Sequence, residues 1–283
     1  MDGRTLKERG RDVRLVISDM DGTLLTSEKR VTERTKKALR ALIREDKGFT
    51  ICTGRIATMI DSYVKELDLR LPIVTANGAV VWDPVGREPL FEKAVPAESA
   101  QEIMDYCRER GLDYSALTLG SSYFSPDSVR IEKFRVYNRI AREEGLPGMR
   151  LEYLDKGHDC LRSQKIYKLL VYEPDRARYE AAGEFLGTIP GIHATSSDSG
   201  LWDISADGVS KGIGLLFIRD YLGLSKNQVC AFGDYDNDIP MLEEAGFPVA
   251  MKNGCDKIKS EAAYVTASCD EDGVALAIEQ FLL

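Results

Sequence analysis

The stretch VRLVISDMDGTLL (residues 13–25) decides the fold of this chain. Its first half is a short apolar run rich in β-branched residues, which is typical of a strand buried on both faces of a parallel sheet. The run then gives way to Asp-Met-Asp-Gly-Thr, where Gly22 permits a turn that would strain other residues. The sequence therefore predicts that the carboxylates of Asp19 and Asp21 lie where a central strand ends, which is the edge at which open α/β sheets bind ligands.

Two carboxylates at such a strand end repel each other. At about 4 Å and an effective dielectric constant near 20, the repulsion is roughly 4 kcal/mol, so a shared proton or a divalent cation must offset it. Oxygen ligands with no His or Cys nearby favour Mg²⁺ over zinc. The alternative is that Asp19 and Asp21 only form the turn and cap a helix. Their place directly after a buried strand makes this the weaker reading.

The composition is that of an ordinary globular protein. Of 283 residues, 43% are apolar and 30% are charged, which allows one large domain or two ordinary ones. The formal net charge of −8 argues against nucleic-acid binding and against an anionic membrane surface. No apolar run reaches the roughly 18 residues of a membrane span. Residues 1–11 lack the apolar core of a signal peptide, and we expect them to be a frayed lead-in.

The cysteines and histidines do not indicate a metal site. None of the six cysteines forms a Cys-x-x-Cys pair, and they are interpreted as buried apolar residues in a reducing cytoplasm. His158 and His193 lie far apart in the chain and are expected to be structural or surface residues. We therefore predict a cytoplasmic protein without disulfides or zinc.

The first part of the chain has the rhythm of a parallel α/β sheet. A helix is expected over residues 32–44, capped by Thr32 and closed by Gly48, and a strand over residues 49–52. A second helix should follow Arg55. Strands at residues 73–76 and 79–82 flank Asn77-Gly78, which is a strong hairpin signal. Strand, helix, strand, helix, strand predicts a parallel sheet with right-handed crossovers.

The pattern changes near residue 84 and returns near residue 209. The middle mixes short strands with helices at residues 96–110, 128–144 and 174–186, which indicates an α+β insertion. From residue 209 the α/β rhythm resumes, and the last helix is expected over residues 272–283. We predict an α/β fold with a Rossmann-like parallel-sheet core over residues 1–83 and 206–283, and an inserted α+β cap domain over residues 84–205.

Chemistry-bearing residues gather at four strand ends or helix starts. Besides Asp19 and Asp21 they are Thr53-Gly54, Lys211, and Asp234 with its neighbours Asn237 and Asp238. The carboxyl ends of parallel strands share one edge of a sheet, so these groups can converge on a phosphoryl group, supplying a carboxylate nucleophile, a metal site, hydrogen-bond donors and a cation. Each also has a simpler reading. Thr53 could cap a helix, Lys211 could lie on the surface, and the acidic loop could imitate a calcium site, although the EF-hand spacing is absent.

In this order the motifs resemble those of haloacid dehalogenase-superfamily phosphatases of the Cof-like group with a type IIB cap. The matching segments are Asp19-Met20-Asp21-Gly22-Thr23-Leu24, then Thr53-Gly54-Arg55, then Lys211-Gly212, then Gly233-Asp234 through Asn237-Asp238. The predicted insertion falls between the second and third segments, as in that group, and Asn77-Gly78-Ala79 is also typical of it. Tyr235 is a departure, because the family often has a small residue there.

The resemblance implies a role for each matched residue. Asp19 would be the nucleophile that forms an aspartyl-phosphate, and Asp21 would be the general acid and base. Mg²⁺ would be held by Asp19, Asp234 and the backbone carbonyl of Asp21. Asp238 would orient Lys211 or metal-bound water. Phosphate oxygens would be held by Met20, Thr53, Gly54, Lys211 and Asn237.

The resemblance also implies a function, a phosphatase acting on small phosphorylated metabolites, with sugar phosphates expected. The cap would set specificity by closing over the site. Substrate-binding candidates are Arg55, which could instead pair with a carboxylate, and Asn77, together with Arg130, Arg135, Lys165 and the Ser196-Ser197 loop, whose simpler reading is a solvated surface. A phosphomutase, a phospho-metabolite-binding regulatory module with little turnover, and a receiver domain are the alternatives. The chain is expected to be a monomer or a weak homo-oligomer.

Overall fold

The structure is a computed structural model that describes residues 5–283 except 144, 147, 156 and 199. It divides into two compact units, which we call the core unit (Met1–Gly54, Leu67–Phe91 and Ser210–Leu283) and the cap unit (Arg55–Glu66 and Glu92–Val209). The main cap segment begins at residue 92 and ends at residue 209, whereas the sequence-based bounds are 84 and 205, and residues 55–66, expected in the core, belong to the cap unit. Each unit is described by itself.

The core unit is built on a five-stranded parallel sheet with the order β14-β13-β12-β1-β2. All four residues of β1 are buried, as an apolar run in the middle of a parallel sheet requires. The α/β fold class is therefore confirmed. The strands are β1 (Leu15–Ser18), β2 (Gly48–Ile51), β12 (Val229–Gly233), β13 (Phe247–Ala250) and β14 (Tyr264–Val265).

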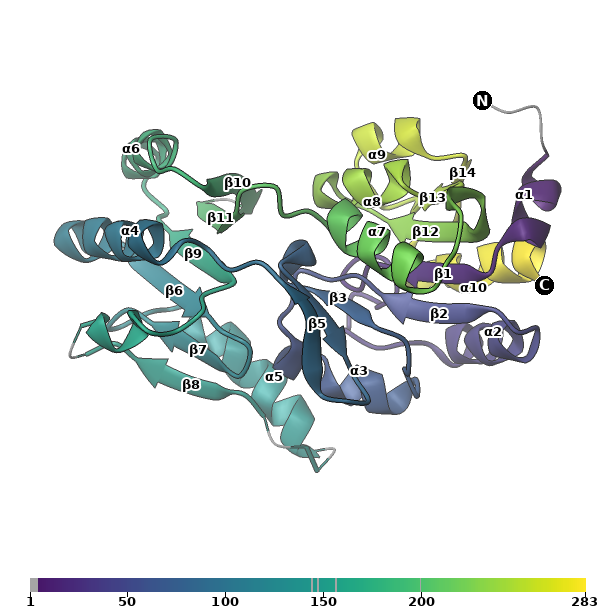
Figure 1. Cartoon of the computed structure of the whole chain (residues 1–283), viewed down its shortest axis with the longest axis horizontal. Coiled ribbons are helices and arrows are strands. Elements are labelled where there is room, and N and C mark those ends of the chain that lie inside the picture. The colour runs from purple at the N-terminus through teal and green to yellow at the C-terminus, as the bar shows by residue number, and fades with distance from the viewer. Residues whose placement is uncertain (1–4, 144, 147, 156, 199) are drawn as a thin grey trace. The chain divides into compact units, whose positions relative to one another are not determined.

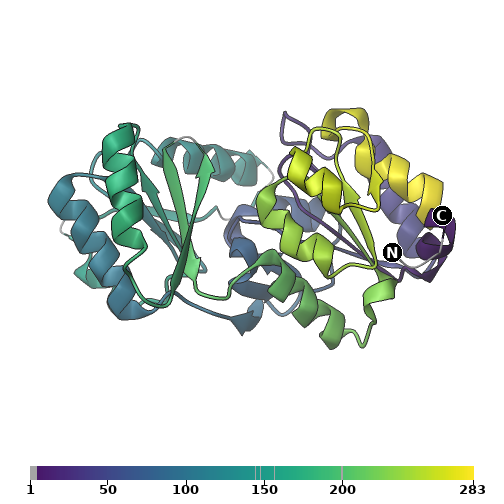
Figure 2. The same cartoon turned by 90° about the horizontal axis from the view of Figure 1, so that it is seen from above.

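Helices form two groups around this sheet. In the first group, α1, α2 and α10 pack with one another or with the C-terminal turn. In the second group, α8 packs against both α7 and α9 (Figure 2). Apolar side chains of the sheet and of α7 and α8 form the buried centre of the unit. The helices are α1 (Leu6–Asp12), α2 (Glu33–Arg44), α7 (Lys211–Tyr221), α8 (Ile239–Glu243), α9 (Asp256–Glu261) and α10 (Gly273–Ala277), followed by a π-turn (Ile278–Leu282).

The predicted hairpin is present, but it does not extend the parallel sheet. Strands β3 (Ile73–Thr75), β4 (Val80–Asp83) and β5 (Glu88–Glu92) form a separate three-stranded sheet, joined to the end of β2 by one parallel bridge from Cys52 to Val74. The predicted parallel direction of this third strand is present at that bridge, but along its length β3 pairs only with β4, antiparallel, after the tight turn Ala76–Gly78, so it is not a full strand of the parallel sheet. A Cβ at Gly78 would lie 2.0 Å from the Ser210 carbonyl oxygen, so only glycine fits there.

The N-terminal segment is not a frayed lead-in where the structure describes it. Thr5 caps α1 in a reciprocal pair with Glu8, and Gly10 is buried against the last turn of the chain. A Cβ on Gly10 would lie 2.0 Å from the carbonyl oxygen of Phe281. The expected closure of α2 by Gly48 is also wrong, because the helix ends at Arg44 with Glu45 as its C-cap, and Gly48 opens β2.

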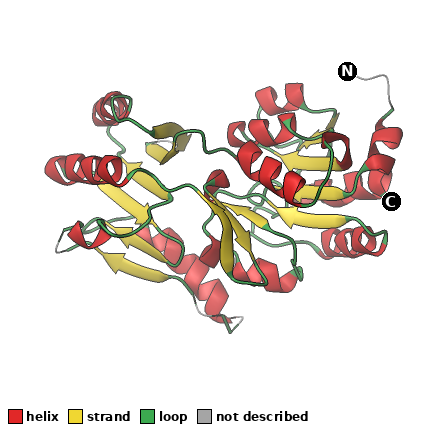
Figure 3. Cartoon of the chain, viewed as in Figure 1, coloured by secondary structure: helices red, strands yellow, loops and turns green. Residues whose placement is uncertain are grey.

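The cap unit has a six-stranded sheet with the order β10-β11-β9-β6-β7-β8, antiparallel except for β7 with β8 (Figures 1 and 3). Its apolar centre lies between this sheet and α4 and α6. As expected, α4 ends at Gly111, whose φ of 60° is left-handed. The strands are β6 (Asp113–Leu117), β7 (Ser121–Phe124), β8 (Arg150–Tyr153), β9 (Lys168–Tyr172), β10 (Ile192–Asp198) and β11 (Leu201–Ala206), and the helices are α3 (Asp61–Glu66), α4 (Ala97–Arg110), α5 (Ile131–Glu143) and α6 (Arg176–Leu186).

Candidate active site

The candidate site lies in the core unit, at the carboxyl end of the parallel sheet. Asp19 follows the last residue of β1, Asp234 follows the last residue of β12, and Lys211 begins α7. The strands β1 and β12 are parallel neighbours in register, so both aspartates leave the sheet at the same edge. Ser210 caps α7 by accepting a hydrogen bond from the backbone N–H of Ile213, which fixes the start of the helix that carries Lys211.

Lys211 is the buried centre of the site. Its side chain is 1% exposed, and its Nζ lies 2.7 Å from Asp19 Oδ1 and 2.6 Å from Asp238 Oδ1. Burial alone would lower the pKa of Lys211, but the two adjacent carboxylates outweigh it and raise that pKa. The side chain therefore stays charged and offsets part of the negative charge around it.

Asp19 and Asp234 resist ionisation when no cation is present. Burial raises the pKa of Asp19 to about 8, with Lys211 opposing the shift and the charges of Asp238 and Asp234 adding to it. Burial likewise raises the pKa of Asp234 to about 6, together with the charge of Asp238. Thr23 Oγ1 donates a hydrogen bond of 2.9 Å to Asp234 Oδ1. Both side chains are therefore held in place by hydrogen bonds, but the positive charge near them is too small to keep both ionised at neutral pH.

Gly22 brings the loop after β1 against Asp234. Its φ is +83°, and a Cβ built on it would lie 2.4 Å from Asp234 Oδ2. Asn253 Nδ2 donates a 2.8 Å hydrogen bond to the Gly22 carbonyl oxygen, which holds the turn in position. Glycine is therefore required here both for the backbone angle and for the close approach of the carboxylate.

Asp238 is fully buried, and its oxygens are occupied by the protein. Oδ1 accepts from Lys211, and Oδ2 accepts from the backbone N–H groups of Asp234 and Tyr235 at 3.0 and 3.1 Å. A Cβ on Gly233 would lie 2.5 Å from the Asp238 Cβ, so this packing needs a glycine at the strand end. Asp238 thus orders the loop that carries Asp234 and holds Lys211.

The carboxylates offer a fitting place for a divalent cation. Oxygen atoms of Asp19, Asp234 and Asp238 lie within 4.8 Å of one another. Because Asp238 already accepts three hydrogen bonds, Asp19 and Asp234 are the residues that could hold the ion. An all-oxygen donor set suits a hard cation such as Mg²⁺, and the raised pKa values show that the site needs positive charge.

The side chain of Asp21 does not join this cluster. It is 38% exposed, and its Oδ1 lies 2.8 Å from the Nζ of Lys29. Lys29 has a φ of 62°, an angle that costs a non-glycine residue about 1 kcal/mol. Sequence reasoning missed Lys29, because no spacing rule links a loop lysine to a carboxylate eight residues earlier.

The Thr53-Gly54 motif lies beside Asn77 and Asn237. Thr53 is buried, and its carbonyl oxygen accepts a 3.0 Å hydrogen bond from the backbone N–H of Asn77. A Cβ on Gly54 would lie 2.8 Å from Asn77 Oδ1, which also accepts a 3.3 Å hydrogen bond from Asn237 Nδ2. Thr53, Gly54, Asn77 and Asn237 therefore form one group. Met20, the next residue after Asp19, is fully buried.

Arg55 belongs to the cap unit and contacts aromatic rings. It is buried, and its guanidinium carbon lies 5.3 Å from the ring centre of Tyr63 and 4.6 Å from that of Tyr137. The expected cap candidates have partners of their own. Arg130 lies over Tyr172, Arg135 pairs with Glu132, Lys165 pairs with Glu92, and Ser196 is exposed on β10, while the side chain of Ser197 lies outside the described residues.

Three residues at the site were not assigned from the sequence. Thr23 lies inside the quoted motif, so its hydroxyl was a visible signal. Asn253 follows β13, the next strand of the sheet, and the rule that strand ends share an edge could have found it. For Lys29 the sequence carries no such signal.

A comparison with models of known protein families shows which family this chain belongs to. The family model described as haloacid dehalogenase-like hydrolase matches residues 16–278. The chain belongs to this family, and the separate cap unit and parallel core agree with its Cof-like subclass IIB. It is a phosphatase of the haloacid dehalogenase superfamily, a phosphoric monoester hydrolase.

Relatives match along nearly their whole length. The 5-amino-6-(5-phospho-D-ribitylamino)uracil phosphatase YcsE of Bacillus subtilis is 30% identical, over 96% of this chain and 97% of its own. A solved haloacid dehalogenase-like hydrolase from B. subtilis is 26% identical with a TM-score of 0.81, covering 95% of this chain and 100% of its own. The subclass IIB sugar phosphatase BT4131 shares the fold at 24% identity and a TM-score of 0.78, over 95% and 99% of the two chains.

Among the helices that the structure describes, none combines the length and the apolar character needed to cross a bilayer.

Proposed function

We propose that this phosphatase requires Mg²⁺ and hydrolyses small phosphorylated metabolites, with sugar and polyol phosphates as the substrate class, through a phosphate ester on Asp19. The observation that carries the proposal is the buried cluster in which Lys211 holds Asp19 and Asp238, with Asp234 beside them. This cluster provides an oriented carboxylate, a fixed cation and two carboxylates for a metal within one small volume.

In the first step, an oxygen of the Asp19 carboxylate attacks the phosphorus atom. The new bond to Asp19 forms as the bond to the substrate oxygen breaks, and the electron pair goes to the leaving oxygen. Asp21, protonated at this stage, gives its proton to that oxygen and releases the alcohol. The exposed position of Asp21 outside the buried cluster supports this role, because the proton donor must reach the substrate, and its ion pair with Lys29 must give way when Asp21 takes up the proton.

In the second step, water hydrolyses the phosphoryl-Asp19 bond. Asp21 is now a carboxylate and takes a proton from the attacking water, and the electron pair of the broken bond returns to Asp19. The positive charge of Lys211, with donors from Thr53, Gly54, Met20 and Asn237, would hold the phosphoryl oxygens in both steps. When bound, Mg²⁺ would neutralise charge between the anionic phosphate and Asp19.

The substrate class rests on the relatives. YcsE is named as a phosphatase of a phosphoribitylamino-uracil, and BT4131 as a sugar phosphatase. Both names describe a phosphate ester on a polyhydroxylated carbon chain. We therefore extend that chemical class, and no single compound within it, to this protein.

Replacement of Asp19 by Asn tests the reaction. With a generic phosphate ester and Mg²⁺, we expect the variant to lose at least about 10³-fold in kcat, because the amide is neither a nucleophile nor an anionic ligand. Asp220→Asn, on the exposed face of α7, is the matched control and should keep its activity. An Asp19→Asn variant with unchanged turnover would reject the proposal.

The same assay distinguishes hydrolysis from transfer to another alcohol. In water labelled with heavy oxygen, hydrolysis places one solvent oxygen in the released phosphate, whereas a phosphomutase returns the phosphoryl group to an alcohol. Metal binding without turnover on a broad panel of phosphate esters would instead favour a regulatory binding module.

A further inference from the structure

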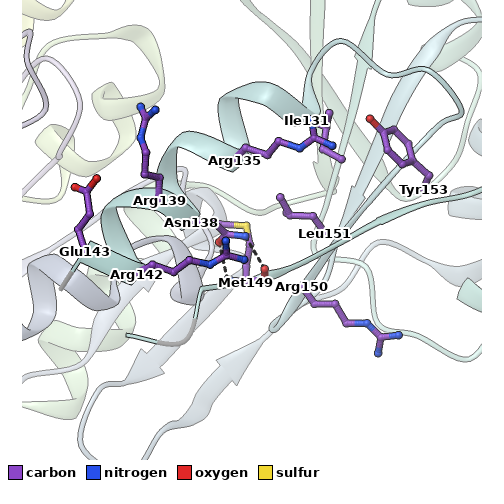
Figure 4. Close-up of a pocket in the computed structure, with 10 residues that line it drawn as sticks. All are labelled: Ile131, Arg135, Asn138, Arg139, Arg142, Glu143, Met149, Arg150, Leu151 and Tyr153. Atoms are coloured by element: carbon purple, nitrogen blue, oxygen red, sulfur yellow. Dashed lines mark hydrogen bonds between the residues drawn. The ribbon is translucent and has the colours of Figure 1, made fainter. Parts of the chain in front are cut away.

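A pocket of about 960 Å³ lies in the cap unit between α5 and β8 (Figure 4). Its volume is within the range of small-molecule sites. Neither the reaction nor the proposed metal site uses it. The residues that line it are Ile131, Arg135, Asn138, Arg139, Arg142 and Glu143 from α5, and Met149, Arg150, Leu151 and Tyr153 at β8.

Four arginines and one glutamate line this pocket, in a chain whose net charge is −8. Arg135, Arg139 and Arg142 recur at the spacing of one helix face, where like charges repel. Arg135 is paired with Glu132 and Arg150 with Glu152, but Arg142 has no ion pair among the residues that the structure describes. In Figure 4 the side chains of Arg135 and Arg142 extend from α5 toward β8. The positive charge on this face is therefore only partly offset.

Two of the lining residues, Asn138 of α5 and Met149 next to β8, are linked by hydrogen bonds. Asn138 is buried, and its Nδ2 and Oδ1 form two hydrogen bonds of 2.8 Å with the backbone carbonyl and N–H of Met149. A Cβ on Gly148 would lie 2.7 Å from Asn138 Oδ1, so glycine permits this approach. Helix and strand are thus fixed relative to each other within the cap unit, and the site is formed before any ligand arrives.

The apolar part of the lining restricts the ligand further. Leu151 is half-buried and Tyr153 is exposed on the edge strand, next to the arginines. Guanidinium groups bind phosphoryl oxygens in pairs, and an aromatic ring offers a face for a flat base. The chain's overall negative charge disfavours long nucleic acids, whose binding depends on an extended basic surface.

We propose that this pocket, whose lining lies wholly within the cap unit, binds a small molecule with linked phosphoryl groups. Arg135 and Arg142 hold the phosphoryl oxygens. A nucleoside polyphosphate and inorganic polyphosphate share this chemistry, and Tyr153 distinguishes them, because only the nucleotide has a base to stack.

Calorimetric titration of the full chain with the β,γ-imido analogue of ATP and with tripolyphosphate, in EDTA, tests the proposal. We expect binding of at least one probe, and a rise in its apparent Kd of about tenfold or more in the Arg135→Gln, Arg142→Gln double variant, as the loss of charge-assisted hydrogen bonds predicts. The control is Arg162→Gln, Arg176→Gln, which makes the same charge change at exposed positions outside the pocket lining.

Hydrogen exchange locates the bound probe. Protection should rise in α5 and β8, and it should be lost in the pocket double variant, which circular dichroism must show to be folded. Tyr153→Ala weakens only the nucleotide analogue if the base stacks there, and an equal affinity of both probes assigns the site to the phosphoryl chain alone. No binding of either probe, or equal loss of affinity in the control variant, overturns the proposal, whatever the outcome of the Asp19→Asn assay.

Discussion

At the scale of single residues, the account depends on charges that are buried together. Lys211, Asp19 and Asp238 stabilise one another only as a set, because a buried ion pair offsets its desolvation cost only while both partners are present. The carboxylate of Asp19, together with that of Asp234, could also hold a divalent cation. One set of contacts therefore explains both the stability of the site and its chemistry.

Lys211→Gln should destabilise the protein strongly. The change leaves the buried carboxylate of Asp238 without its counter-charge and removes the hydrogen bond to Asp19, and we expect a loss of about 3 kcal/mol or more in the free energy of unfolding, measured by urea titration at neutral pH. Lys252→Gln breaks an exposed ion pair with Glu271, which water and salt screen, and should change the free energy of unfolding far less. Similar losses in the two variants would contradict the description of this cluster.

Gly22→Ala should damage the site far more than it damages the fold. Besides the strain of φ +83°, the new Cβ would displace Asp234, so we expect weaker Mg²⁺ binding and a fall in activity of at least about a hundredfold. Gly223→Ala imposes a similar angle, φ +65°, with no atom within 4 Å of the new Cβ, and should cost only about 1 kcal/mol of stability. Equal activity in both variants would show that the contact with Asp234 is unimportant.

At the scale of elements, sequence patterns predicted what depends on neighbours along the chain. The buried run of β1, the Thr32 cap and the Gly111 stop are local signals, and the structure contains all three. The rule that parallel strands end at one edge also predicted which motifs could meet. Lys211, Asp19 and Asp234 are up to 215 residues apart in number, yet a shared sheet edge leaves them little freedom.

Elements that depend on a distant partner were not predictable. The hairpin of residues 73–75 with β4 was a local signal, but the sequence does not show that β3 meets the distant β2 at one bridge only. The helix α1 is short and polar, and its stability comes from the last turn of the chain. Lys29 reaches Asp21 through a backbone angle that no residue pattern indicates.

Because of the way α1 packs, we expect a glycine-to-alanine change in this helix to lower the stability of the protein. In a helix, Gly→Ala normally stabilises by up to about 1 kcal/mol, but a Cβ at Gly10 would overlap the Phe281 carbonyl. We therefore expect Gly10→Ala to lower the melting temperature. Gly187→Ala, at the end of α6 with φ −64° and its nearest contact at 3.4 Å, should be neutral or stabilising. A stabilised Gly10→Ala variant would mean that α1 does not pack this way.

At the scale of the whole molecule, we expect pH and metal to act on stability through the same two carboxylates. Because burial raises the pKa of Asp19 to about 8 and that of Asp234 to about 6, the folded, metal-free protein holds more protons than the unfolded chain between about pH 4 and pH 8. The free energy of unfolding should therefore fall as pH rises through this window, by about 1 kcal/mol per pH unit for each extra proton.

A cation that replaces these protons should reverse the trend. We expect the stabilisation by Mg²⁺, measured as a shift in melting temperature against EDTA, to grow between pH 6 and pH 8. In Asp19→Asn, which has no carboxyl group to titrate at this position, both the fall with pH and the gain from Mg²⁺ should shrink. A metal effect independent of pH and of Asp19 would place the cation elsewhere.

The central claim is that Asp19 carries the phosphoryl group during turnover. Rapid acid quench of the enzyme with a substrate labelled with radioactive phosphorus, followed by peptide mapping, tests it most directly. The account predicts transient label on the peptide that contains Asp19, formed as fast as the alcohol is released and absent from Asp19→Asn. Release of alcohol and phosphate together, with no label on the chain at any time, would contradict it.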